Sequence, residues 1–287
     1  MLLGDSSAHS EAANGRGAPP VVVDGALTPE RAAELYPQHA DAIALGCRCH
    51  ACPLLGCGRG PVMPVLPEPL DLLVLAQEPG DQEVEVGEPL VGPSGKLTAG
   101  AVRLAGWDHA WGRDNAVLCQ SPNGDIEKYE TLCRKRKLPS PLTACRPHLA
   151  HSVGRARYVF TMGAVALRAV GAGAGINKVR GTPVQIPASP PVIPNAVPAM
   201  PILHAAHVLR KKWRHLAPVF RADVAKGVRI AIEGGPRWSA PSYFRATSAD
   251  GLARFLWQQR DRLAVDTETS RDGPWNCRLY RIGFGTD

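Results

Sequence analysis

Four short runs of β-forming residues, each ending in small or polar residues, constrain the fold of this chain more than any other feature. They lie at 71–77, 115–120, 156–163 and 199–207. Helical patterns separate them, as at 96–107, which follows a loop rich in Gly, Pro and acids. Strands that alternate with helices predict an α/β fold, a three-layer sandwich around a central, mainly parallel sheet. A functional site in such a sheet lies beyond the carboxyl ends of its strands.

The length of 287 residues corresponds to roughly two domains. Small polar residues dominate the start of the chain, and Thr28 followed by Pro29 forms a helix-start signal. Pro37 is expected to split the helical stretch that follows. The predicted divisions are a flexible tail with short helices at 1–45, the main domain at 46–228, a linker at 229–250 and a partial second domain at 251–287.

The chain is basic, because 33 Lys and Arg residues exceed 26 Asp and Glu residues and give a formal net charge of +7. This excess favours a polyanionic partner, nucleic acid first. Apolar residues make up 45% of the chain, which excludes disorder throughout. The sequence contains no run of about 18 uncharged apolar residues and no secretion signal at its start, so we expect a cytoplasmic protein without a membrane span.

Eight cysteines in a chain of this kind indicate thiols, metal ligands or cluster ligands rather than a disulfide framework. Cys47, Cys49, Cys52 and Cys57 lie within eleven residues. The spacing of Cys49 and Cys52 lets two thiolates grip one metal centre from a tight turn. The four thiolates could hold zinc locally, and the alternative is a set of unligated buried cysteines.

Seven motifs follow one another in order along residues 46–225. They are C-x-x-C-P-L at 49–54, A-Q-E-P-G at 76–80, G-E-P-L-V-G-P-S-G at 87–95, an asparagine strand at 115–121, a turn at 162–166, R-G at 180–181 and H-A-A at 204–206. This set resembles the family 4 uracil-DNA glycosylases, the iron–sulfur branch of the uracil-DNA glycosylase superfamily. The resemblance implies a DNA-binding enzyme of a bacterial or phage-infected cell that removes uracil by hydrolysing the N-glycosidic bond.

In the family that the chain resembles, two cluster ligands come from the N-terminal cysteine pair, one from the asparagine strand and one from the next helix. The resemblance therefore implies a four-iron four-sulfur cluster on Cys49, Cys52, Cys119 and Cys145. It leaves over Cys47, Cys57, Cys133 and Cys277. A basic run, C-R-K-R-K-L-P at 133–139, lengthens the stretch before Cys145, so Cys133 stays open as the fourth ligand.

Cleaving the bond between uracil and deoxyribose needs a flipped nucleotide, a donor that faces the developing charge on uracil, a group that positions water, and an amide that reads the uracil edge. The resemblance assigns the donor to His204, the water to Glu78 or Gln77, and the uracil edge to Asn115. It also places Gly80 where backbone amides approach a phosphate or the base.

Several positions depart from the family pattern. Gln77 replaces the glutamate of the catalytic loop, while a carboxylate follows at Glu78, where other branches carry aspartate. Leu90 stands in the substrate pocket in place of a phenylalanine that stacks on uracil, and loss of an aromatic platform forfeits ~1–3 kcal/mol per base. Ala205 and Ala206 replace Pro-Ser. These departures favour the alternative function, a catalytically impaired iron–sulfur module that binds DNA for an attached replication polymerase.

The stretch 207–216 combines Arg210, Lys211, Lys212 and Arg214 with an aromatic residue, Trp213. One interpretation is a solvated helical face. The other is a DNA contact in which the basic residues bind phosphates and the tryptophan acts as a wedge. We expect the DNA contact, with Arg210 as a substrate-binding residue.

The apolar run 263–270 contains Asp266 and Glu268, alternate residues that share one face of a strand and can share a divalent metal. It resembles the first motif of the 3′–5′ exonuclease domain of family A DNA polymerases, and 278–287 resembles the next strand. We therefore expect 251–287 to hold the first strands of a ribonuclease H-like domain within a longer, phage-type DNA polymerase. The other metal-binding acids of that domain are missing, so we expect no exonuclease activity from these residues alone.

Overall fold

The computed structural model describes residues 27–173, 175–234, 248–258, 264–269 and 279–285. The chain divides into two compact units, Met1–Arg237 and Trp238–Asp287. The expected flexible tail at 1–26 lies outside the described residues, and so does most of the predicted linker. Within the described ranges, no helix is both long enough and apolar enough to cross a membrane.

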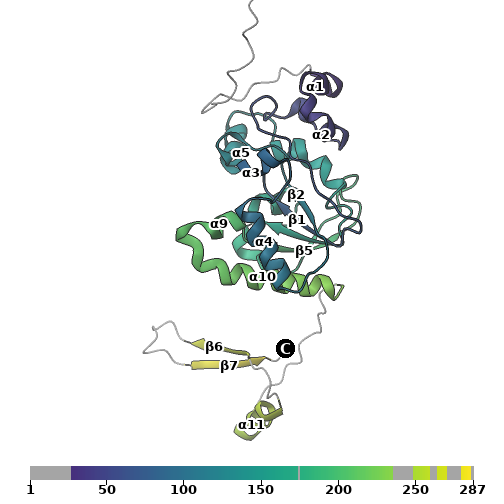
Figure 1. The fold of residues 1–287 in the computed structure, drawn as a ribbon. Coiled ribbons are helices and arrows are strands. Elements are labelled where there is room, and N and C mark those ends of the chain that lie inside the picture. Colours follow the sequence, from purple (N-terminus) through teal and green to yellow (C-terminus); the bar gives the residue numbers. More distant parts are fainter. Residues whose placement is uncertain (1–26, 174, 235–247, 259–263, 270–278, 286–287) are drawn as a thin grey trace, which may run out of the picture. The chain divides into compact units, whose positions relative to one another are not determined.

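The first unit is built on a five-stranded sheet with the strand order β2-β1-β3-β5-β4 (Figure 1). Its strands are β1 Leu72–Ala76, β2 Gly112–Asn115, β3 Tyr158–Met162, β4 Val184–Ile186 and β5 Val197–Ile202. β1 pairs in parallel with β2 and β3, and β3 pairs in parallel with β5. Only β4, at one edge of this sheet, is antiparallel to its neighbour. The predicted α/β sandwich with a mainly parallel central sheet is confirmed.

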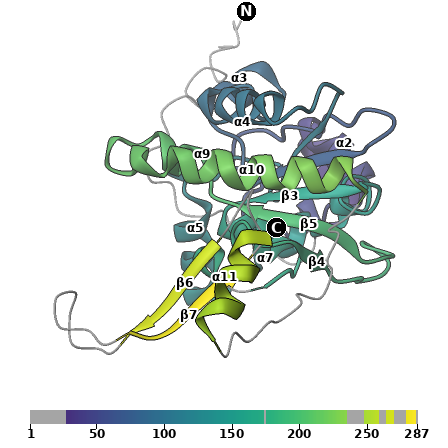
Figure 2. The same ribbon diagram turned by 90° about the horizontal axis from the view of Figure 1, so that it is seen from below.

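The two faces of the sheet bury two separate cores. In β1, Leu73 and Leu75 belong to one core, whereas Leu72 and Val74 belong to the other, as the alternation of a strand requires. The core of Leu72 is covered by α4 Pro93–Leu104 and α10 Ala217–Ile232, and Figure 2 shows α10 running across the sheet. The core of Leu73 is covered by α5 Ile126–Lys135, α6 Pro141–Cys145, α7 Ala164–Ala169 and the N-terminal helices.

The N-terminal helices follow their sequence signals. Thr28 caps α1 Pro29–Leu35 by accepting the N–H of Arg31 at 3.2 Å. Pro37 begins the 3-10 turn η1 Pro37–His39, which separates α1 from α2 Ala40–Ala44. The remaining helical segments of the first unit are η2 Cys49–Ala51, α3 Asp81–Val86, η3 Pro122–Gly124, η4 Arg146–Ala150, α8 Ile176–Val179, α9 Ala205–Leu209 and η5 Lys211–Leu216.

The strand predicted at 115–120 is wrong in its position, because β2 ends at Asn115, where the predicted run begins. Val117 and Leu118 are fully buried, yet they lie in a bent segment beyond the sheet. Val117 donates its N–H to the carbonyl of Gln77, and the carbonyl of Leu118 accepts the N–H of Val62. An apolar run indicates burial but does not distinguish a strand from a buried loop whose backbone groups are paired elsewhere.

The second unit contains α11 Ala249–Gln258 and an antiparallel hairpin of β6 Ala264–Thr269 and β7 Leu279–Gly285. In the hairpin register, Asp266 lies opposite Gly283 and Glu268 lies opposite Arg281. In the first unit, α10 continues to Ile232, so residues 229–232 of the predicted linker form its last turn.

Candidate active site and cysteine centre

A pocket lies beyond the carboxyl ends of β1, β2 and β5, where an α/β sheet places its site. Its lining residues are Ala76, Gln77, Glu78, Pro79, Gly80, Glu83, Leu90, Ser94, Asn115, Gln120, Gly124, His204 and Ala206. This set includes all of the residues that the sequence suggests for catalysis and base binding. Arg210, the suggested DNA contact, does not line the pocket and follows α9.

Asn115 ends β2 and is 2% exposed. Its main chain is fixed, because its N–H donates to Oδ1 of Asp114 at 2.7 Å and its carbonyl oxygen lies 3.0 Å from Nε2 of His148. Its side-chain nitrogen Nδ2 is buried and has no hydrogen-bond partner among the described residues. A buried donor without a partner costs about 1–3 kcal/mol, so this amide is suited to a ligand that brings a carbonyl oxygen.

Glu78 and Gln77 follow β1 but differ in their contacts. The carboxylate of Glu78 accepts the N–H of Ser121 at 2.7 Å and the N–H of Ile126 at 2.8 Å. Burial raises the pKa of Glu78, although these amide bonds oppose the shift. The side-chain amide of Gln77 makes no hydrogen bond to any described residue. Both oxygens of Glu78 are therefore bound to the backbone, whereas Gln77 lines the pocket with a side-chain amide that has no hydrogen bond within the described residues.

Glu83 is a pocket residue that the sequence interpretation missed. It is 8% exposed, and its carboxylate accepts the N–H of Gly80 at 3.1 Å and the N–H of Gly92 at 2.8 Å. It thereby joins the start of α3 to the loop before α4. The signal was available, since an acid three residues after a helix N-cap is the second half of a capping box.

Leu90 forms an apolar wall of the pocket and has a left-handed backbone, with φ 58. A Cβ at Gly95 would overlap the carbonyl of Leu90, so only glycine lets the two backbones approach this closely. A non-glycine residue in this conformation stores about 1 kcal/mol or more of strain. The close packing of the 87–95 loop holds Leu90 against that strain.

His204 follows β5 and is the N-cap residue of α9. Its Nδ1 accepts the N–H of Ala206 at 3.2 Å, which places the ring proton on Nε2. Burial, and after it the positive charge of Arg210, lowers the pKa of His204 to about 4. Gly163 lies against the ring with φ +90, and a Cβ there would come within 3.1 Å of the His204 Cβ. The site thus holds a neutral imidazole that can donate from Nε2.

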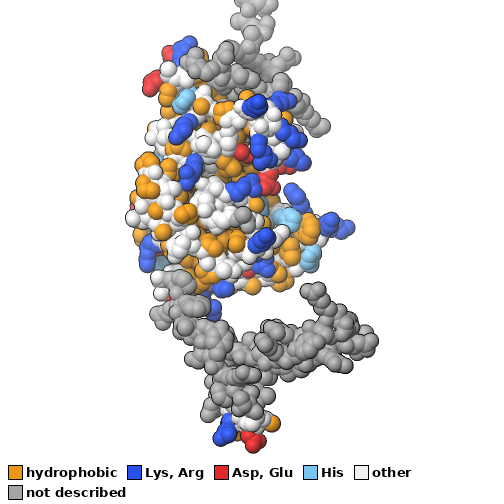
Figure 3. Space-filling model, turned by 180° about the vertical axis from the view of Figure 1, so that it is seen from behind, with side chains coloured by type: hydrophobic (Ala, Val, Ile, Leu, Met, Phe, Trp, Pro, Cys, Tyr) orange, Lys and Arg blue, Asp and Glu red, His pale blue; other side chains and the backbone are white. Residues whose placement is uncertain are grey.

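The basic stretch after His204 is a broken helix rather than one continuous helical face. Helix α9 ends at Leu209, the backbone of Arg210 is extended, and the 3-10 segment η5 follows. Trp213 stacks on His207 with 4.8 Å between ring centroids, and the Nζ of Lys212 lies 5.2 Å from the centroid of the tryptophan ring. Figure 3 shows Lys, Arg and His side chains gathered at one edge of the first unit. The basic side chains of this segment are therefore exposed beside the Trp213 ring, whose orientation is fixed by stacking on His207.

A second cavity collects most of the cysteines on the face of the sheet covered by α5 and α6. It is lined by His39, Cys47, Cys49, Cys52, Leu54, Leu55, Val117, Cys119, Ala144 and Cys145. The four cysteines suggested as cluster ligands are therefore brought together with a fifth, Cys47. Cys57 and Cys133 do not line this cavity, and Cys277 lies outside the described residues.

The donors in this cavity fit a cationic centre with a preference for sulfur. Burial and the nearby Cys145 raise the pKa of the Cys52 and Cys119 thiols, so thiolates at these positions require a compensating positive charge. A hydrogen bond from Cys47 lowers the pKa of Cys49 to about 5. Zinc and iron–sulfur centres are the usual partners of clustered thiolates.

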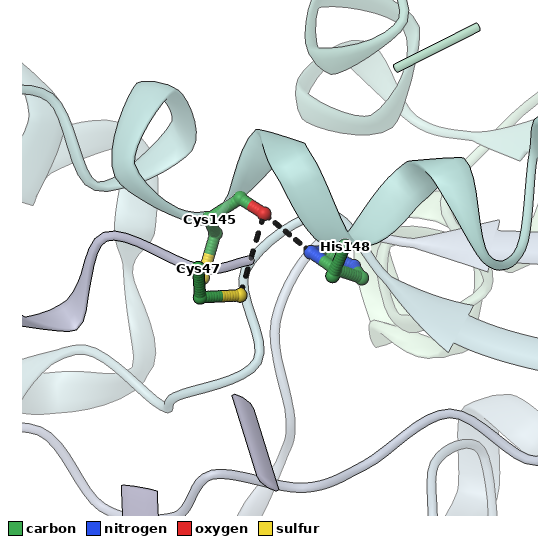
Figure 4. Close-up of side chains that lie close together, drawn as sticks. All are labelled: Cys47, Cys145 and His148. Atoms are coloured by element: carbon green, nitrogen blue, oxygen red, sulfur yellow. Dashed lines mark hydrogen bonds between the residues drawn. The ribbon is translucent and has the colours of Figure 1, made fainter. Parts of the chain in front are cut away.

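One further group of possible metal ligands overlaps this cavity. The sulfurs of Cys47 and Cys145 and a ring nitrogen of His148 lie within 4.8 Å of one another (Figure 4). Cys47 donates from its Sγ to the carbonyl of Cys145 at 3.6 Å, and Nδ1 of His148 lies 2.5 Å from the same oxygen. The sequence suggested Cys47 only as a local zinc ligand beside Cys49, Cys52 and Cys57, and its contact with Cys145, 98 positions away, was not foreseen. His148 was not suggested at all, although it lies only three residues after Cys145.

The comparison with known families agrees with this geometry. The family model named Uracil DNA glycosylase superfamily matches residues 63–224, which is more than half of the chain. The match includes the pocket residues, Cys119 and Cys145, and begins after the Cys49–Cys52 pair. No curated protein matches the chain. The pocket at the end of the sheet and the extent of the family match together place this chain in the uracil-DNA glycosylase superfamily.

Proposed function

We propose that this protein binds DNA and removes uracil from it by hydrolysing the N-glycosidic bond. The observation that carries the proposal is the meeting, in one pocket, of the partnerless Asn115 amide, the neutral His204 ring and the Gln77–Glu78 loop. Membership in the superfamily supports the same class of reaction. The pocket can hold only a base that has left the duplex stack, so the nucleotide must be flipped out.

Base recognition falls to Asn115. Its free Nδ2–H donates to a uracil carbonyl, and its Oδ1 accepts from the ring N–H of uracil. Uracil leaves as an anion, and His204 stabilises it by donating from Nε2 to the oxygen on which the negative charge develops. The low pKa of His204 keeps the ring neutral, so it acts as a hydrogen-bond donor and transfers no proton.

The attacking water is positioned by the loop after β1. Gln77 is the better placed of the two candidates, since its amide is free, whereas both oxygens of Glu78 accept backbone N–H groups. Glu78 still contributes negative charge close to the sugar, where the reaction develops positive charge. In this assignment Gln77 orients water and Glu78 holds the loop and offsets charge.

In this proposal, Arg210 and the η5 segment bind the DNA backbone beside the pocket. Their positive charges neutralise phosphates of the DNA. Trp213, which stacks on His207, contacts the DNA strand. Because α9 connects His204 directly to Arg210, the base pocket and the backbone grip belong to one continuous segment.

The deciding experiment is incubation with a uracil-containing oligonucleotide followed by alkali, which breaks the strand at abasic sites. We expect strand breakage at uracil and none at thymine in the matched sequence. Intact strands at stoichiometric protein would overturn the glycosylase assignment. The second candidate function, a catalytically impaired DNA-binding module, is favoured by Leu90, by the two alanines after His204 and by the engaged oxygens of Glu78.

We also propose that Cys49, Cys52, Cys119 and Cys145 hold a four-iron four-sulfur cluster. When bound, such a cluster supplies a structural cross-link between distant parts of the chain. The buried thiols around one cavity support this assignment, and this cavity shares no lining residue with the base pocket. Cys47 is a fifth thiol in the same cavity and accounts for part of the hydrogen bonding of Cys49 and Cys145.

For the second unit, we propose the start of an exonuclease-like domain of a polymerase, in the same or a neighbouring chain. The strand β6, with Asp266 and Glu268 two positions apart, and the antiparallel β7 support this proposal. The test is sequencing of the transcript beyond the codon for Asp287. The remaining exonuclease acids are expected in a continuous reading frame or in the next gene. A stop codon with no polymerase reading frame beside it would overturn the proposal.

A further inference from the structure

His148 lies between the cysteine centre and the base pocket. It belongs to η4 and is fully buried. Its Nδ1 lies 2.5 Å from the carbonyl oxygen of Cys145, as Figure 4 shows, and its Nε2 lies 3.0 Å from the carbonyl oxygen of Asn115. The ring therefore spans from a proposed cluster ligand to the residue proposed to read uracil.

Asp114 completes this contact. Its Oδ2 makes no hydrogen bond within the described residues but lies 3.3 Å from Nε2 of His148, and its Oδ1 accepts the N–H of Asn115 at 2.7 Å. Both Asp114 and His148 are 0% exposed. The peptide groups on both sides of Asn115 are thus held by one buried acid and one buried base, while the Asn115 side chain is left free to face the pocket.

We propose that His148, paired with Asp114, is a positioning residue that fixes Asn115 for base recognition and sets its place relative to the Cys145 turn. The inference rests on the proposed function, because it assumes that Asn115 reads the base. His148 does not line the pocket and has no contact with a substrate, so any effect on uracil must pass through Asn115.

A purely space-filling role does not account for this geometry. Each ring nitrogen faces a carbonyl oxygen, and an apolar ring of the same size would leave the carbonyl oxygens of Cys145 and Asn115 without this partner. Asn115 then has little freedom, which suits an amide that must distinguish one base edge from another.

The test is a double-mutant cycle on binding to an oligonucleotide that carries 2′-fluoro-2′-deoxyuridine, whose fluorine slows cleavage of the glycosidic bond. The measured quantity is the ratio of affinities for this oligonucleotide and its thymine-containing counterpart. Asn115→Ala should abolish the preference for uracil, and His148→Gln should lower it about tenfold, the size expected for one buried hydrogen bond. The double variant should be no worse than Asn115→Ala alone, because His148 acts only through Asn115.

Arg210→Ala provides the matched control, since Arg210 lies outside the pocket and is proposed to contact phosphate. Its loss of affinity should add to that of His148→Gln and leave the uracil preference unchanged. Losses of preference that add between His148→Gln and Asn115→Ala, or an unchanged preference in His148→Gln, would overturn the inference while the proposed function stands. A full preference in Asn115→Ala would overturn the base-reading role and this inference with it.

If His148→Gln does not fold, Asp114→Asn serves instead. This variant keeps the volume and the histidine but removes the charge opposite Nε2, and we expect the same non-additive loss against Asn115→Ala. Metal content and visible absorption are measured in every variant. Unchanged spectra with a lowered uracil preference support the positioning role, whereas a preference that falls only in samples that lose their metal would overturn it.

Discussion

The carboxylate of Glu78 accepts the N–H of Ile126, the first residue of α5, at 2.8 Å. A second amide, from Ser121, binds the other oxygen. Glu78→Ala should therefore lower the free energy of unfolding by about 2–4 kcal/mol, because two amides lose a charged acceptor. Chemical denaturation measures this loss.

Gln77→Ala is the paired variant. It should leave the free energy of unfolding within about 0.5 kcal/mol of the wild-type value, because its amide binds no described residue. Uracil release should instead slow by about tenfold to a hundredfold in a single-turnover assay. If Gln77→Ala were fully active and Glu78→Gln inactive yet stable, Glu78 would be the water-positioning residue.

A depressed pKa at His204 predicts the pH dependence of stability. The pKa of His204 is about 4 in the folded protein and about 6.5 in an unfolded chain. As the pH falls from about 6.5 towards 4, the unfolded chain takes up the proton first, so the stability that His204 contributes above this range is lost. Unfolding at a series of pH values should show this loss, and His204→Gln should lack its share of it.

The same residue predicts an activity profile. Because the ring stays neutral above about pH 4, uracil release should not fall between pH 8 and 5 through titration of His204. His204→Gln, whose amide can donate in place of Nε2, should be at least about tenfold faster than His204→Ala. Equal rates for the two variants would show that donation from this position is not used.

The cysteine cavity predicts the colour of the protein. Purified anaerobically, it should be brown, and Cys49→Ser or Cys119→Ser should bleach it and lower its solubility. Cys57→Ser and Cys133→Ser are the controls and should keep the colour, since neither residue lines the cavity. One zinc per chain without iron would contradict the cluster assignment.

The basic segment predicts the salt dependence of binding. Replacing Arg210 and Lys212 with alanine should weaken binding to uracil-containing and normal DNA alike, and should flatten the slope of log affinity against log salt by about two. Arg155 and Arg157, which precede β3 at the opposite end of the sheet, form a control pair of equal charge. Their replacement should leave the slope unchanged, and equal effects from both pairs would indicate non-specific attraction only.

Local signals in the sequence were sufficient for much of the fold. The parallel strands β1 and β3 lie in runs whose composition predicted them, and Thr28 and Pro37 act as the helix signals indicate. The run 199–207 is only partly strand, because β5 ends at Ile202 and α9 begins at Ala205. The position of β2 was predicted wrongly, because the buried residues after Asn115 belong to a loop. Hydrophobicity indicates which residues are buried but not which backbone groups form hydrogen bonds with one another. The capping bond of Thr28 reaches only three residues along the chain, whereas β2 pairs with β1, about forty residues away.

The candidate site was predictable where motif order placed residues, as for Asn115 and His204. Residues that contact the site or the cysteine cavity from distant positions in the sequence were not predictable in this way. His148 contacts Asn115 from 33 positions away, and Cys47 contacts Cys145 from 98 positions away. No spacing rule links such pairs, because only the folded sheet brings them together. Glu83 is the exception, since its capping position is a local signal.

The distance along the chain between the cysteines has a consequence for synthesis. Cys47 and Cys145 are separated by 98 positions, and the cavity is complete only when both are present. At about 5–20 residues per second, a ribosome needs roughly 5–20 s to bring the later cysteine out after the earlier one. During that interval the first thiols are exposed in an unfinished chain. The cavity therefore cannot close around any bound group before synthesis has passed Cys145.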